Sequence, residues 1–118
     1  AVNFVATIFK MRAPGMTFFR MPAYVWAVLS AQLIQLSALP VLTAGAVMLL
    51  FDLAVGTHFF DANEGGNPVL FQHFFWFYSH PAVYVMALPV FGVFSEIVPV
   101  YSRKPLFGYK VVAVSSLL

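Results

Sequence analysis

Two long stretches of the chain carry no charged residue. One covers residues 21–51 and the other covers residues 65–95, and each is 31 residues long. The hydrocarbon core of a bilayer is about 30 Å thick, and a helix needs about 20 apolar residues to cross it. Each stretch is therefore long enough for a transmembrane helix, with residues to spare for tilt or for helix ends outside the lipid.

Apolar and polar residues in these stretches do not alternate, as they would in the strands of a transmembrane β-barrel. Shorter apolar runs open and close the sequence, which begins at Ala1 rather than at Met. We therefore predict an all-α membrane protein, a polytopic transmembrane helix bundle with two complete spans and two partial ones, and expect the chain to be a piece of a larger protein. The predicted segments are the end of a span at 1–10, a span at 22–52, an outer loop at 53–67, a span at 68–101 and the start of a span at 106–118.

Composition narrows the class of protein further. Hydrophobic residues make up 62% of the chain and charged residues 8%, and the mean hydropathy is +0.90. A typical soluble domain carries about 25% charged residues, so a soluble enzyme, a disordered tail and a nucleic-acid-binding protein are all excluded. The net charge is only +2, and the absence of cysteine excludes disulfides and thiolate metal sites.

The charges that remain fall on two sides of the predicted spans. The outer loop carries acidic residues and no basic residue: Asp52 directly precedes it, and Asp61 and Glu64 lie within it. Every lysine and arginine lies on the other side, in the segments that join the remaining spans: Lys10, Arg12, Arg20, Arg103, Lys104 and Lys110. The positive-inside rule assigns the basic side to the cytoplasm.

The span at 68–101 holds the polar residues that suggest chemistry. An ionisable side chain at membrane depth is costly and indicates a functional site, and His80 is such a residue. Trp76, His80 and Tyr84 recur every four positions and so share one helix face. Imidazole is a common ligand of copper and iron. The alternative is that His80 hydrogen-bonds across a helix interface and that the aromatic residues only pack.

Further polar residues follow on the same helix. Ser95 lies eleven residues beyond Tyr84, nearly on the same face and about 16 Å further along the axis. It either belongs to a polar track that leads to the phenol or bonds to its own helix backbone. Glu96 is either a solvated carboxylate at the helix end or the mouth of that track. Tyr78 lies on a different stripe of the helix, which it shares with Ala82.

The sequence resembles subunit I of the haem–copper oxidases over essentially its whole length. QHFFWFYSHPAVYVMALPVFGVFSEI, followed by YSRKPLFGY, is similar to that family's sixth helix and its passage into the seventh. KMRAPGMTFFRMP resembles the loop between the fourth and fifth helices, and FFDANEGGNPVLFQH resembles the outer loop before the sixth. The W-x-x-x-H-P-x-V-Y pattern is the most specific part of the likeness.

The resemblance implies a role for each matching residue. His80 matches a histidine ligand of the active-site copper, and Tyr84 matches the tyrosine that is covalently joined to that histidine and supplies a proton and an electron for O–O cleavage. Trp76 matches a tryptophan packed beside the copper. Ser95 matches a serine of the proton route that ends at the tyrosine, and Glu96 lies next to it.

One position departs from the family pattern. Most members carry glutamate in H-P-E-V-Y, where it gates protons, but this chain has Ala82. Tyr78 and Ser79 precede His80 instead, which resembles a bacterial subgroup that uses Tyr-Ser in place of the glutamate. Because Tyr78 lies one turn before Ala82, its hydroxyl can occupy similar space and relay protons. Mitochondrial subunits resemble the glutamate form, so a bacterial plasma membrane is expected.

The resemblance therefore implies part of the catalytic subunit of a respiratory terminal oxidase. The complete subunit would reduce O₂ to water, translocate protons, bind two haems and copper, and assemble with other oxidase subunits. The haem ligands and the remaining copper ligands would lie outside this chain, which alone would be inactive. Cytochrome c is the expected electron donor. Alternatives are a quinol oxidase, a nitric oxide reductase-like enzyme, which Tyr84 disfavours, and a non-catalytic transporter bundle.

Overall fold

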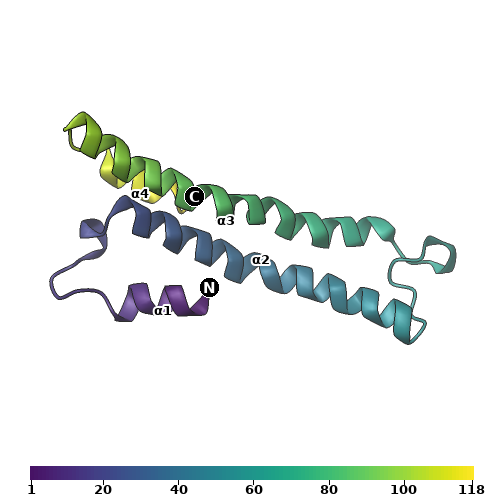
Figure 1. Cartoon of the computed structure of the whole chain (residues 1–118). Coiled ribbons are helices and arrows are strands. Elements are labelled where there is room, and N and C mark those ends of the chain that lie inside the picture. Colours follow the sequence, from purple (N-terminus) through teal and green to yellow (C-terminus); the bar gives the residue numbers. More distant parts are fainter. The chain divides into compact units, whose positions relative to one another are not determined.

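All elements of the chain are helical (Figure 1). The computed structural model describes residues 1–118 and contains, in order, α1 (Val2–Lys10), the 3₁₀ turn η1 (Phe18–Arg20), α2 (Ala23–Ala54), the 3₁₀ turn η2 (Ala62–Glu64), α3 (Pro68–Ser102) and α4 (Tyr109–Ser115). The predicted all-α class is confirmed.

Helices α2 and α3 are long and apolar enough to cross a membrane. Their best 18-residue windows have mean hydropathies of 2.0 and 1.9, and only 11% and 6% of these windows are buried inside the structure. A helix that is apolar all round must be buried in protein or in lipid. Because so little of either helix is buried by the chain itself, their composition fits a membrane bundle rather than the core of a soluble domain.

The chain divides into two compact units. The first unit contains Ala1–Ile34 and Val83–Leu118, and the second contains Gln35–Ala82. All six lysines and arginines belong to the first unit. The second unit holds Asp52, Asp61 and Glu64 and no basic residue. The charge segregation found in the sequence therefore follows the division of the structure.

The first unit has a small core beside the N-terminal part of α2. Met21, Trp26, Leu29 and Ala113 are buried there, and Tyr109 packs against them. Trp26 Nε1 donates to the Phe18 carbonyl at 2.9 Å, and the Tyr109 hydroxyl donates to the Met21 carbonyl. These bonds satisfy the polar ends of both aromatic side chains, as burial of such groups requires. They tie α4 and the η1 turn to the start of α2.

Helices α2 and α3 approach closely at Gly92. A Cβ atom added at Gly92 would lie 2.8 Å from the Ala27 Cβ and 2.9 Å from the Tyr24 Cα. One of these neighbours is backbone and cannot swing aside. Glycine is therefore required here because a larger side chain would not fit. Its backbone conformation does not require glycine, since Gly92 has no left-handed φ.

We expect Gly92→Ala to destabilise the full-length subunit by about 1–3 kcal/mol, because the added methyl group overpacks the contact. The measurement is the denaturant midpoint of the purified protein. Val93→Ile is the matched control, since it adds one carbon at the neighbouring position, where the side chain is 41% exposed. A Gly92→Ala variant as stable as the control would contradict the packing described above.

In the second unit, polar side chains form hydrogen bonds with the loop between α2 and α3 and with the start of α3. The Asp52 carboxylate accepts hydrogen bonds from Thr57 Oγ1 at 2.6 Å, from Phe59 N at 2.9 Å and from Phe60 N at 3.0 Å. At the start of α3, Asn67 Oδ1 accepts from Val69 N at 3.0 Å, as an N-cap does. The loop therefore has a defined conformation between two helix ends. His58 lies in this loop, half exposed, with Nδ1 4.0 Å from Asp61 Oδ2.

Candidate functional site

Every residue for which the sequence predicts a chemical role lies on α3. In the second unit are Trp76, Tyr78, Ser79 and His80, and in the first unit are Tyr84, Ser95 and Glu96. Helix α3 starts at Pro68, a position where the missing N–H of proline costs little. It stays α-helical through Pro81 and Pro89, so the helical register of the motif is kept. Residues four apart on such a helix share a face.

The second-unit part of the motif presents an indole and an imidazole. Trp76 is 63% exposed, and its ring packs edge-on against Phe75 with 5.2 Å between centroids. Phe71 stacks on Phe75 in turn, at 6.4 Å. These aromatic rings give the helix an apolar surface in the turns before His80. His80 is exposed on α3 and makes an interaction within the chain.

A copper or haem site needs several ligands close together. No group of three or more His, Asp or Glu side chains is placed to hold a metal ion. A neutral imidazole is a suitable donor for copper, so His80 fits as one member of a ligand set. Any such site would need further ligands beside His80.

Tyr84 lines a cavity of about 260 Å³ within the first unit. Its ring is 46% exposed, and polar as well as apolar atoms form the cavity wall. The other lining residues come from α2, α3 and the C-terminal segment: Ile34, Leu88, Ser115, Ser116, Leu117 and Leu118. The tyrosine therefore has hydroxyl-bearing neighbours from a segment about 30 residues further along the chain.

A pair of serine hydroxyls lies beside this cavity wall. Ser30 is 1% exposed, and its Oγ lies 3.2 Å from the Oγ of Ser116. Ser30 Oγ also donates to the Trp26 carbonyl at 2.9 Å. The pair joins α2 to the end of α4 through side chains, in addition to the contacts of the small core.

Glu96 has a partner that neither sequence-based interpretation included. Its Oε1 accepts a hydrogen bond from the backbone N–H of Tyr24 at 3.3 Å. Tyr24 is in the first turn of α2, where backbone N–H groups have no partner within the helix and a negative charge is favoured. The carboxylate therefore holds the start of α2 to α3. Ser95, one residue earlier, is half-buried.

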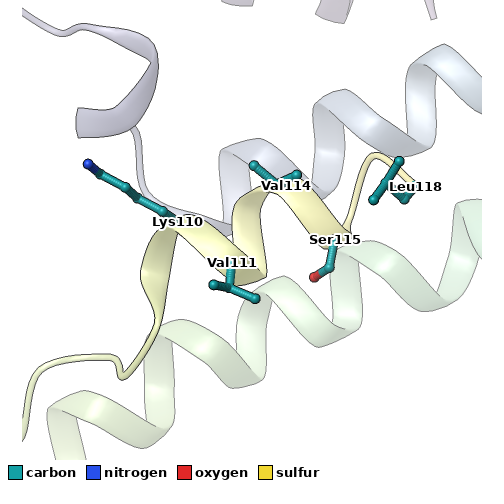
Figure 2. A pocket seen from close by; sticks show the side chains of 5 residues that line it. All are labelled: Lys110, Val111, Val114, Ser115 and Leu118. Carbon is teal, nitrogen blue, oxygen red and sulfur yellow. The ribbon is translucent and has the colours of Figure 1, made fainter.

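A larger cavity, of about 380 Å³, also belongs to the first unit and shares Ser115 and Leu118 with the Tyr84 cavity. Figure 2 shows its lining side chains, which come from α4 and the residues that follow it: Lys110, Val111, Val114, Ser115 and Leu118. The lining is apolar, and Lys110 Nζ lies 5.8 Å from the ring centroid of Phe19. None of the predicted site residues lines it, so the Tyr84 cavity is the better candidate.

Ser30, Ser116 and the backbone N–H of Tyr24 were not foreseen from the sequence. The contacts that reveal them join residues 86 positions apart in one case and 72 in the other. A serine in an apolar helix most often bonds to its own helix, so no local pattern distinguishes the ones that meet another helix.

Comparison with known proteins agrees with the resemblance found in the motifs. A profile of the family described as cytochrome c and quinol oxidase polypeptide I matches residues 1–118. The chain is 53% identical to cytochrome c oxidase subunit 1 of Thermostichus vulcanus and 54% identical to that of Synechocystis sp., over 99% of the chain and 21% of each relative. It is 49% identical to the Bacillus subtilis protein of the same name, over 92% of the chain and 17% of the relative.

The chain thus spans about a fifth of the length of these relatives. The match is nevertheless continuous over the two long helices, the loops and the His80–Tyr84 motif. On the strength of the whole-chain family match, this chain belongs to the cytochrome c and quinol oxidase polypeptide I family.

Proposed function

We propose that the chain is part of the catalytic subunit of a terminal respiratory oxidase that reduces O₂ to water at a haem–copper centre. The observation that carries the proposal is the His80–Pro81–Ala82–Val83–Tyr84 motif on one apolar helix of a chain that matches the oxidase family throughout. The relatives named above are cytochrome c oxidase subunits, so cytochrome c is the proposed electron donor.

In the complete subunit, His80 would bind copper through one ring nitrogen. The haem iron and the copper, when bound, supply the redox chemistry of oxygen. This chain would hold the His80 imidazole at one position along α3 and the Tyr84 phenol one helical turn further on. Trp76, one turn before His80, would cover the same face and exclude water from the metal side.

Tyr84 would act through its hydroxyl. A phenol can give up a proton and an electron together, which leaves the residue neutral in a medium where charge is costly. We propose that the imidazole of His80 and the phenol ring of Tyr84 are covalently joined, as the resemblance implies. Joining them removes one hydrogen from each ring, and O₂, the proposed substrate, takes up the two protons and two electrons.

Protons would reach the site along α3. Ser95 and Glu96 would form one route from the side that carries the lysines and arginines, and Tyr78 with Ser79 would form a second route in place of the glutamate that most of the family carries. The position of Glu96 beside the first turn of α2 supports an entry point there, because its carboxylate is held near a helix end. We propose that this basic side faces the cytoplasm, and that the membrane is a bacterial plasma membrane.

We expect Tyr78→Phe to slow proton pumping while copper binding stays at the wild-type level, because the change removes one hydroxyl and keeps the ring. The measurement is proton release by oxidase vesicles during a limited number of turnovers, with copper determined in the same preparation. Tyr101→Phe, on the 85%-exposed side chain near the end of α3, is the control. Equal loss of copper and pumping in the Tyr78 variant would show that Tyr78 has a structural role.

The proposed function is tested with the purified full-length subunit in complex with its partner subunits. We expect haem absorption bands, copper and iron in the metal analysis, and oxygen consumption with reduced cytochrome c. A colourless, metal-free protein would contradict the proposal and favour a transporter bundle. Formation of N₂O from nitric oxide without oxygen reduction would assign the protein to the nitric oxide reductases instead.

A further inference from the structure

Both hydroxyls of the Ser30–Ser116 pair also bond to a helix carbonyl. Each hydroxyl has a single proton to donate. Ser30 Oγ donates to the Trp26 carbonyl at 2.9 Å, and it lies 3.2 Å from the Oγ of Ser116. Ser116 Oγ donates to the Ala113 carbonyl at 2.8 Å. The oxygen of Ser116 is therefore fixed in place while it keeps the capacity to accept a hydrogen bond.

Ser116 lines the same cavity as Tyr84. At about 260 Å³ the cavity has room for several water molecules, since one water needs only about 10–15 Å³ of probe volume. A buried water also needs two to four polar partners. Three of the lining residues carry a hydroxyl group, namely Tyr84, Ser115 and Ser116. Residues of α3 and of the C-terminal segment can therefore supply such partners.

We infer that this cavity is a water-binding site and that Ser116, held by Ser30, positions the water that hydrogen-bonds to Tyr84. The inference rests on the proposed function, in which Tyr84 must recover a proton in each cycle. Through this water the phenolic proton exchanges with solvent: the phenol gives one proton to water and receives another, so no net charge or electron moves. Ser116 touches neither metal nor oxygen and acts only through the water.

Radiolytic footprinting of the full-length oxidase complex tests the site directly, because hydroxyl radicals form from water next to the side chain that they label. We expect strong labelling of Tyr84 in the wild type. Ser116→Ala should lower both the Tyr84 labelling rate and the oxygen turnover about fivefold, as expected for the loss of one hydrogen bond. Ser116→Thr keeps the hydroxyl and should restore both.

Two further variants complete the design. Ser30→Ala removes the hydroxyl that contacts Ser116, and it should lower Tyr84 labelling in the same direction. Ser102→Ala removes a serine hydroxyl that donates to Pro99 at the end of α3, outside the cavity, and should change neither readout. Haem spectra of all variants should equal the wild-type spectrum.

Unchanged Tyr84 labelling in Ser116→Ala would overturn the inference. So would equal losses in the alanine and threonine variants, because packing rather than the hydroxyl would then be responsible. Failure of the proposed function looks different: the wild-type complex itself would then lack haem, copper and oxygen consumption. If the wild-type complex reduces oxygen and the Ser116 variants behave like it, only the water site is rejected, and the proposed function stands.

Discussion

Replacing Tyr84 by phenylalanine in the complete oxidase should lower oxygen consumption by at least about 100-fold, the scale on which a positioned proton donor acts. The change removes one oxygen atom and leaves the ring, so α3 and its packing should stay intact. The proposed reaction needs the phenolic proton and electron at this place, one turn from His80. The measurement is steady-state oxygen uptake with reduced cytochrome c, together with the haem absorption spectrum.

The spectrum decides between loss of chemistry and loss of folding. We expect recognisable haem bands in the Tyr84→Phe enzyme, with an unchanged ratio of haem to protein. Tyr101→Phe removes the same atom from an exposed side chain on the same helix and should retain wild-type turnover. Wild-type oxygen consumption by the Tyr84 variant would show that the phenol only packs.

His80→Asn should remove copper from the complete subunit while the haem remains. Loss of even a supporting residue around a metal ligand weakens binding by about 10–100-fold, so loss of the ligand itself should have at least that effect. Asparagine keeps a polar side chain on the helix but lacks the imidazole nitrogen that suits copper. The measurement is the ratio of copper to haem iron in the purified complex, with oxygen uptake as a second readout.

His73→Asn is the matched control, because His73 lies seven residues earlier on nearly the same face of α3. We expect normal copper and normal turnover in that variant. If both histidine variants lost copper equally, an effect on the fold of α3 would explain the result. If neither lost copper, His80 would be a residue that only bridges helices.

The fold could be predicted from sequence because it depends on the length of the apolar stretches and on where the charges interrupt them. The two charge-free stretches correspond to long apolar helices, since lipid imposes a minimum length and forbids interrupting charges. Helix α3 could be predicted despite the prolines at 81 and 89, because the apolar run continues on both sides of them. All-α class and family therefore followed from the chain itself.

The surroundings of the site could not be predicted in the same way. The Ser30–Ser116 pair and the bond from Tyr24 to Glu96 depend on how helices distant in sequence meet. The close approach at Gly92 is of this kind too, since a glycine in an apolar helix has many possible reasons. Helical periodicity shows which residues share a face, but not which face meets which.

The most direct test of the central claim is the mass of the proteolytic peptide that contains both His80 and Tyr84, taken from the full-length oxidase. If the two rings serve oxygen as a joined pair, the peptide is lighter than its sequence mass by two hydrogen atoms, and the Tyr84→Phe peptide has its full sequence mass. A wild-type peptide at full sequence mass, from a preparation that reduces oxygen, would contradict the account.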